Sequence, residues 1–360
     1  MFNAIALVKI LVVAVSGFVL ALLWSPLLTD WLYRNKFWKQ KARELAPDGS
    51  PTPIFNQMHK EKEVGTPRAG GLLVWLTVLL VMAIYWSLSK LFPDSLFSSF
   101  DFVSRRETWL PLFTLVVAGI IGFVDDYLVV RGKGKYIGGG LSFTKRVLLV
   151  IVIGLIAAWW FYFKLGADSI YVPLLGSLAI GWLYIPLFVL VMLAVFSSGV
   201  VDGLDGLSGG VFSTIFTAYT VIAFARGQYD LAAFSLLLVG TLMAYLWFNI
   251  PPARFYMGET GVLALTSVLT VMAFLTNTVL LLPIIGIILV LESGSVAIQL
   301  LSKKFRGKKV FLVAPIHHHF EALGWPAYKV TMRFWVISAL GALAGVILAL
   351  TGSVLAIIFK

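Results

Sequence analysis

The segment Val201-Asp202-Gly203-Leu204-Asp205-Gly206-Leu207 places two carboxylates between two long apolar stretches. Residues 180–196 before it carry no charge, and neither do residues 211–225 after it. If both stretches are membrane helices, the loop between them holds two acids and no basic residue. A carboxylate at bilayer depth costs at least roughly 2.5 kcal/mol, so Asp202 and Asp205 should face a cation, a polar partner or water. The alternative is a plain Asp-Gly turn with a solvated helix cap, and the heptad alone does not decide.

The spacing of the two aspartates adds a geometric expectation. Residues three apart share one face if the segment coils helically, so Asp202 and Asp205 would then point the same way. Gly203 and Gly206 leave room for a backbone or a ligand to approach closely. Two carboxylates together predict a metal ion or a cationic ligand.

The composition identifies the class of protein. Hydrophobic residues make up 60% of the 360 residues and charged residues 12%, with a mean hydropathy of +0.95. These values are typical of a polytopic membrane protein, and we expect an all-α fold in one domain over residues 1–360. The chain has no cysteine, which leaves oxygen or imidazole ligands for any metal and favours a hard cation such as Mg²⁺.

Hydropathy predicts about ten transmembrane helices. The apolar segments begin near Ile5, Gly71, Trp109, Val147, Ile180, Val211, Leu231, Val262, Val279 and Phe334. The weakest separation is residues 276–278, where one kinked helix could replace two. We expect the first segment to be a retained helix, because it lacks a basic leader and an obvious cleavage site.

The distribution of charge predicts the orientation. Most of the Lys and Arg residues fall in the odd-numbered loops between these segments, and the net charge of +11 therefore reflects topology and does not indicate a nucleic-acid partner. Positively charged loops are cytoplasmic, so we expect both termini outside.

The polar motifs lie in the same odd-numbered loops. They are Gly65-Thr66-Pro67, Asp125-Asp126, the Asp202 heptad, Trp247-Phe248-Asn249, Tyr256-Met257-Gly258-Glu259 and Ala314-Pro315-Ile316-His317-His318-His319. The motifs should therefore converge on one cytoplasmic site.

Acidic and basic side chains on one face predict a particular chemistry. Carboxylates hold a divalent cation and basic groups hold phosphates, so a pyrophosphate substrate bridged by Mg²⁺ requires both, whereas a cation channel requires only the acids. A transporter predicts an internal repeat and charges at mid-span, and Glu292 is the only charge near mid-span. Adjacent Asp125 and Asp126 cannot point the same way on a helix. The histidine run is either an incidental loop tract or a source of hydrogen bonds and protons.

Taken together and in this order, the motifs resemble the polyprenyl-phosphate N-acetylhexosamine-1-phosphate transferase superfamily, and within it the phospho-N-acetylmuramoyl-pentapeptide transferase (translocase I) family. The likeness covers nearly the whole chain, and the motif Ala-Pro-Ile-His-His-His-Phe-Glu is its most specific part. The resemblance implies ten membrane helices in the bacterial plasma membrane, Mg²⁺ dependence and a homodimer. It further implies attack by undecaprenyl phosphate on UDP-MurNAc-pentapeptide to give lipid I and UMP, directly or through an Asp-bound intermediate.

The resemblance also assigns roles to residues. Glu259 is the leading Mg²⁺ ligand with Asp125, while Asp125 is the candidate base. Asp205 and Tyr256 contact the uridine. The catalytic set is Asp125, Asp126, Asp202, His317 and His318, and the substrate-binding set is Lys62, Thr66, Arg146, Asp205, Asn249, Tyr256, Gly258 and His319.

Three positions depart from the usual family pattern. Glu259 stands where the family has Asp, Gly199 where it has Asn, and Glu63 where it favours Lys, with Lys62 alongside. The alternatives are a sister transferase that moves GlcNAc-1-phosphate to the same lipid and, in a different class, an ion-coupled transporter.

Overall fold

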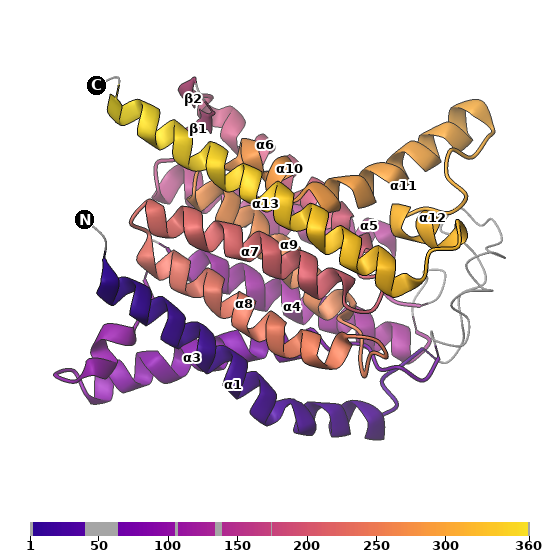
Figure 1. The fold of residues 1–360 in the computed structure, drawn as a ribbon, viewed down its shortest axis with the longest axis horizontal. Helices are drawn as coiled ribbons and strands as arrows, with labels where there is room; N and C mark the ends of the chain where they lie inside the picture. Colours follow the sequence, from indigo (N-terminus) through magenta and orange to yellow (C-terminus); the bar gives the residue numbers. More distant parts are fainter. Residues whose placement is uncertain (1–2, 40–63, 105–106, 134–138, 174, 359–360) are drawn as a thin grey trace.

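Helices build most of the described chain (Figure 1), in a computed structural model that describes residues 3–39, 64–104, 107–133, 139–173 and 175–358. The helices on the amino-terminal side are α1 (Ala4–Arg34), α3 (Leu72–Leu91), α4 (Trp109–Val130), α5 (Phe143–Trp159) and α6 (Tyr184–Ser197). They are followed by α7 (Leu207–Ala225), α8 (Tyr229–Asn249), α9 (Gly258–Leu275), α10 (Leu282–Ile285), α11 (Ile287–Arg306), α12 (Ile316–Ala322) and α13 (Ala327–Ile358). The predicted helical fold is confirmed.

Nine helices in the described part of the chain are long and apolar enough to cross a membrane, and a bent pair raises the number to as many as ten. The pair is residues 279–285 with α11, and its two halves meet at 84°. Apolar sequence continues on both sides of the bend, so hydropathy predicted one segment there and gave no sign of the bend. Residues 276–278, where one kinked helix was an alternative, instead separate α9 from the next segment, and Asn277 takes a φ of 48°.

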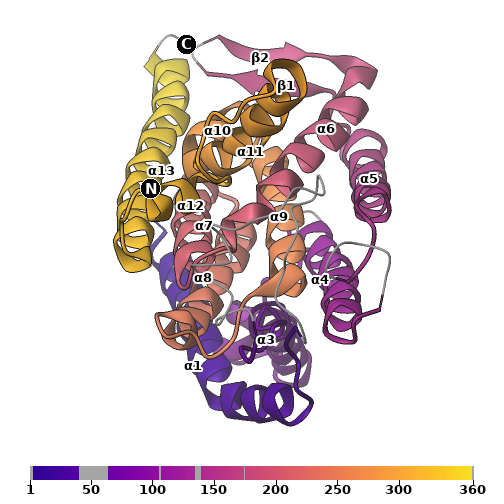
Figure 2. The ribbon, with the colours of Figure 1, turned by 90° about the vertical axis from the view of Figure 1, so that its right-hand side faces the viewer.

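The helix α9 lies in the centre of the bundle (Figure 2). It contacts α3, α4, α6 and α7, and nearly all its residues are buried. A helix that is apolar all round is expected in such a position. Glycines allow the close approach: a Cβ at Gly122 of α4 would collide with the Glu259 carbonyl, and one at Gly71 would collide with Gly261. This packing fixes the first turn of α9, which carries Glu259.

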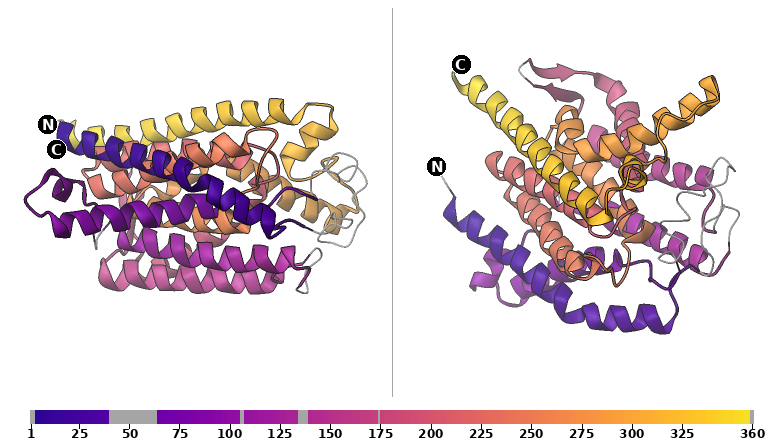
Figure 3. Two further views of the ribbon diagram at one scale, coloured as in Figure 1. Left: turned by 90° about the horizontal axis from the view of Figure 1, so that it is seen from below. Right: turned by 45° about the vertical axis from the view of Figure 1, so that its right-hand side comes forward.

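The two ends of the bundle differ in character. The amino- and carboxyl-terminal ends of the chain lie at the same end (Figure 1; Figure 3, left), and the polar motifs lie at the other. A short hairpin near the terminal end, β1 (Ser169–Val172) paired antiparallel with β2 (Gly176–Ala179), departs from the strictly all-α expectation. The helix α11 projects away from the bundle on the side of the polar motifs (Figure 3, right). The motifs therefore meet at one end, as predicted, while the membrane side that this end faces remains a prediction.

Candidate active site

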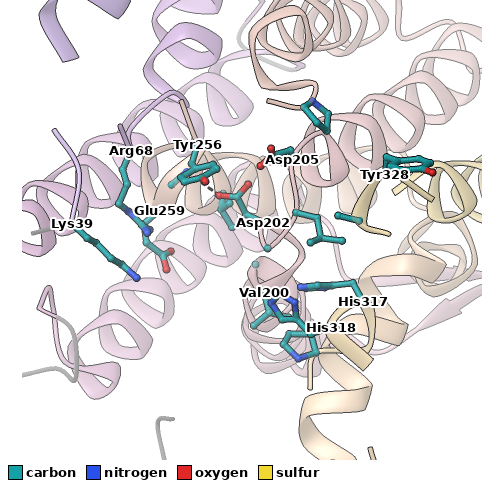
Figure 4. A pocket seen from close by; sticks show the side chains of 18 residues that line it. Lys39, Arg68, Val200, Asp202, Asp205, Tyr256, Glu259, His317, His318 and Tyr328 are labelled. Atoms are coloured by element: carbon teal, nitrogen blue, oxygen red, sulfur yellow. Dashed lines mark hydrogen bonds between the residues drawn. The ribbon is translucent and has the colours of Figure 1, made fainter. Parts of the chain in front are cut away.

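A pocket of about 520 Å³ opens where the polar motifs meet (Figure 4). Five segments far apart in sequence line it, at residues 39, 68, 199–205, 251–262 and 315–328. The charged and aromatic side chains in its wall are Lys39, Arg68, Asp202, Asp205, Tyr256, Glu259, His317, His318 and Tyr328. Acids and bases from distant motifs thus share one cavity, which is what a bound pyrophosphate and cation require.

The Asp202 heptad forms a tight turn between α6 and α7. A 3-10 turn over Ser198–Val201 precedes it, and α7 begins only at Leu207. The segment between them is not helical, so the condition under which Asp202 and Asp205 would share a helical face is not met. Both side chains nevertheless line the pocket.

The two aspartates of the turn have different partners. Asp202 Oδ1 accepts a hydrogen bond from Ser208 Oγ (2.7 Å), and its Oδ2 accepts one from the Gly258 amide (3.0 Å). Burial raises the pKa of Asp202 to about 6, although these two hydrogen bonds oppose the rise. Asp205 Oδ2 accepts a longer hydrogen bond from the Ala253 amide (3.2 Å).

Asn249 ties this turn to the loop before α9. Its Oδ1 accepts from the Gly206 amide (2.8 Å), and its Nδ2 donates to the Phe255 carbonyl (2.9 Å). The side chain is buried and does not line the pocket. The structure therefore shows a scaffolding role for Asn249, whereas its predicted contact with substrate stays a prediction.

Adjacent Asp125 and Asp126 point to different arginines, in agreement with the helical geometry. Asp126 is fully buried, pairs with Arg68 Nε (2.9 Å) and accepts from the Thr260 amide and hydroxyl (2.9 and 2.7 Å). Asp125 accepts from the Leu141 amide (2.6 Å) and lies 3.0 Å from Arg146 Nη2. Neither aspartate lines the pocket, and each is paired with an arginine.

Arg146 bridges two acids of the site. Its Nη1 bonds Glu259 Oε1 (2.8 Å), and its Nη2 faces Asp125. Glu259 is about a quarter exposed and lines the pocket. The predicted substrate contact of Arg146 has no support in this arrangement, because the guanidinium faces the two carboxylates and is not part of the pocket wall.

The donor set fits a magnesium ion that is shared with a substrate. No group of three or more acidic, His or Cys side chains within the described residues could hold a metal ion by itself. Mg²⁺, however, commonly takes one or two carboxylates and completes its shell with waters and phosphate oxygens. Glu259 and Asp202 supply hard oxygen atoms at the pocket wall, while Asp125 could reach an ion only if Arg146 moved.

The three histidines lie on α12, so of the two alternatives the loop tract does not hold. Successive residues on a helix point in different directions. His317 Nδ1 lies 2.7 Å from Glu292 Oε2, and His318 Nδ1 lies 2.7 Å from Glu321 Oε2. His319 Nδ1 instead accepts from the Leu312 amide (3.2 Å). His317 and His318 line the pocket, and His319 does not.

Of the remaining predicted residues, some line the pocket and others do not. Tyr256 and Gly258 line the pocket. Thr66 is half-buried outside the pocket wall, and Lys62 lies outside the described residues.

The sequence analysis missed Tyr328, Lys39 and Arg68 in the pocket wall, and Glu292 behind it. Arg68 and Lys39 were counted only as loop charges, yet both line the pocket. Glu292 was noted only as the charge near mid-span, and that isolation was itself a usable signal, since a buried acid needs a partner.

Known proteins resemble this chain over most of its length. The family model described as glycosyl transferase family 4 matches residues 108–277, from α4 to the end of α9. The phospho-N-acetylmuramoyl-pentapeptide-transferase of Anoxybacillus flavithermus is 36% identical over 342 residues, covering 94% of this chain and 97% of the relative. The proteins of the same name from Bacillus subtilis and Lacticaseibacillus paracasei are each 34% identical, covering 94% and 93% of this chain and 97% of each relative.

The chain belongs to the phospho-N-acetylmuramoyl-pentapeptide-transferase family. Its place in that family gives one departure a structural meaning. Gly199 lines the pocket, and a Cβ there would lie 2.7 Å from Val262 Cγ1. In this member of the family, a side chain at position 199 would have to displace Val262.

Proposed function

We propose that the protein transfers phospho-MurNAc-pentapeptide from UDP-MurNAc-pentapeptide to undecaprenyl phosphate, giving lipid I and UMP. The observation that carries the proposal is the pocket in which Arg68, Asp202, Glu259 and His317 meet at one end of the membrane bundle, in a chain that aligns over 94% of its length with transferases of that name.

The chain's own groups supply binding and alignment. Phosphoryl transfer depends mainly on positioning and on neutralising charge, because two anions must approach each other. Lys39 and Arg68 are the cations in the pocket wall for the diphosphate. Tyr256 offers a ring for the uracil and Asp205 an acceptor for the nucleoside. Asp202 lies beside Tyr256 (Figure 4).

Glu259 and Asp202 would hold a Mg²⁺ ion, which when bound neutralises the pyrophosphate. Asp125 and Asp126 keep Arg146 and Arg68 in place at the back of the site. Asp125 can act as the base toward the lipid phosphate only after Arg146 swings away. His317 and His318 are the candidate donors or proton carriers on the opposite wall.

The setting of the reaction is part of the proposal. We place the enzyme as a multi-pass protein in the bacterial plasma membrane, with the pocket facing the cytoplasm, where the basic loops of the sequence belong. The lipid substrate then arrives from the bilayer and the nucleotide from the cytosol. We propose a homodimer on the resemblance alone.

The other candidate functions have less support. An ion-coupled transporter would expose its mid-span acid to a pathway, whereas Glu292 is fully buried against His317. Transfer of GlcNAc-1-phosphate would use the same metal and nucleotide contacts. UDP-GlcNAc needs fewer cationic groups beyond those that hold the diphosphate. The pentapeptide substrate is larger and more anionic, so it needs such additional groups.

The test is the release of UMP by purified protein with undecaprenyl phosphate and Mg²⁺. UDP-MurNAc-pentapeptide and UDP-GlcNAc are compared at equal concentration, and reactions without the lipid serve as the control. We expect lipid-dependent UMP only from the pentapeptide substrate. A preference for UDP-GlcNAc would remove the peptidoglycan assignment and leave the broader transferase class.

A further inference from the structure

Glu292 lies inside the bundle on α11, a turn and a half beyond the bend at Gly286. It is the only acidic residue of that helix, and its side chain has no exposure to solvent. Its neighbours along α11 are apolar or small, so the carboxylate requires a specific partner.

His317 on α12 is that partner. Its Nδ1 lies 2.7 Å from Glu292 Oε2, and both side chains are fully buried. The other two polar atoms, Glu292 Oε1 and His317 Nε2, have no hydrogen-bond partner in the part of the chain that the structure describes. Glu292 therefore contacts the histidine through one oxygen, and the second ring nitrogen of the histidine takes no part in this contact.

Stability does not explain this pair. A buried ion pair often contributes no more than apolar residues of the same volume, and buried polar atoms without partners are unfavourable. A buried polar atom without a partner calls for an explanation, and a functional role is one such explanation.

The second ring nitrogen of His317, Nε2, faces the turn formed by the Asp202 heptad. A Cβ at Gly203 would collide with His317 Nε2, so the ring edge lies directly against the Gly203 backbone, between Asp202 and Asp205. Gly203 and His317 both belong to the pocket wall. Figure 4 shows the two histidines across the pocket from Arg68 and Glu259.

The hydrogen bond to Glu292 defines the state of that nitrogen. With Glu292 ionised, its carboxylate can only accept, so His317 Nδ1 is then the donor. A neutral imidazole that carries its proton on Nδ1 has a bare Nε2, which can accept a hydrogen bond or a proton.

We propose that Glu292 is a positioning residue for the transferase reaction, fixing His317 with the proton on Nδ1 and with Nε2 held as an acceptor beside Gly203. The inference rests on the proposed function in so far as it concerns turnover. The tautomer that it predicts exists without substrate.

The first measurement is the ¹⁵N spectrum of histidine-labelled protein in lipid, without substrate. The chain has only four histidines, and the His317→Ala variant identifies the signals of His317. We expect a protonated Nδ1 and a bare Nε2 in the wild type and in Glu292→Gln, whose amide oxygen can still accept. Glu292→Met fills the volume without an acceptor and should shift the ring toward the other tautomer. An Nε2-protonated wild type, or an unchanged Met variant, would overturn the proposal.

The second measurement separates kcat from KM. Glu292→Met should lower kcat by about 100-fold, the scale of a lost acid–base group, with little change in the KM for the nucleotide substrate. Glu292→Gln should stay within about tenfold of the wild type. The matched control is Ser295→Ala, which removes a buried hydroxyl bonded to the Glu292 carbonyl on the same helix and leaves the carboxylate in place. An equal loss of kcat in that control would assign the effect to the packing of α11 instead.

Coupling between the two residues gives the third measurement. In a His317→Ala background, Glu292→Met should cost little further activity, since Glu292 acts only through the ring. Independent, additive losses contradict the proposal. If Glu292→Met does not fold, Glu292→Asp replaces it, because Asp keeps the charge but withdraws it by one methylene. Mixed tautomers with reduced kcat support the inference, and wild-type behaviour of Asp refutes it. A wild type that shows the predicted tautomer yet releases no UMP would refute the proposed function alone.

Discussion

Glu259 is the pocket carboxylate whose charge matters most to the proposed reaction. Glu259→Gln keeps the shape but removes the anionic ligand, so turnover should fall by about 100-fold or more, whereas Glu259→Asp should retain part of it. Activity is measured against Mg²⁺ concentration, with thermal unfolding as the check on folding. Normal turnover of the Gln variant at limiting Mg²⁺ would show that Glu259 is not a ligand.

Asp202 gives the site an expected dependence on pH. Without a bound metal its pKa is raised to about 6 by burial, so kcat/KM at limiting Mg²⁺ should fall as the pH drops through about 6 and the carboxylate takes up a proton. Ser208→Ala removes a hydrogen bond that opposes the rise. The pKa should then increase, and the acidic limb of the profile should move to higher pH.

The matched control for that change is Ser213→Ala. It lies on the same helix, and its hydroxyl bonds only the Gly209 carbonyl. A limb that moves equally in both variants, or to lower pH in Ser208→Ala, would rule out Asp202 as the titrating group.

For single residues, the sequence predicted which residues belong to the site better than it predicted their contact partners. Asp202, Asp205, Tyr256, Glu259, His317 and His318 were all predicted, and all line the pocket. The pairing of Asp126 with Arg68 joins residues 58 apart, and that of Glu292 with His317 joins residues 25 apart. Nothing in a local motif specifies such partners, because helix packing decides them.

The contact between α4 and α9 positions Glu259, and the addition of one methyl group at Gly122 tests this role. In Gly122→Ala the new Cβ meets the Glu259 carbonyl, and overpacking of this kind costs about 1–3 kcal/mol. We expect a lower unfolding temperature and reduced activity. Gly294→Ala, a glycine of α11 whose Cβ would meet open space, is the control and should be neutral or slightly stabilising. Equal behaviour of the two variants would contradict the role of this contact.

The existence of the helices was predictable from hydropathy, but some starts were misplaced, since α13 begins at Ala327 and not near Phe334. Changes of direction were not predictable. The 84° bend at Gly286 joins two apolar pieces, so the pattern carries no sign of it beyond the glycine. The histidines lie on the seven-residue helix α12, which is too short to show a period. The hairpin β1–β2 escaped notice because four-residue strands beside membrane helices read as apolar continuations.

For the whole molecule, the absence of cysteine in the sequence makes topology directly measurable. A single cysteine at Lys308 should react with a membrane-impermeant reagent only after the cytoplasmic side is opened. One at Asn3 should react in intact cells, because the termini lie at the opposite end of the bundle from the pocket. Labelling of the Lys308 position in intact cells, with none at Asn3, would invert the topology and place the pocket outside.

The fate of the β-phosphorus tests the central claim most directly. Purified protein in lipid vesicles with undecaprenyl phosphate and Mg²⁺ is given UDP-MurNAc-pentapeptide labelled at the β-phosphate. Transfer of phospho-MurNAc-pentapeptide predicts that the label moves into the lipid fraction in step with UMP release, and that Glu259→Gln abolishes both. Label that stays with the nucleotide as UDP would mean that the sugar moves without its phosphate, and would contradict the account.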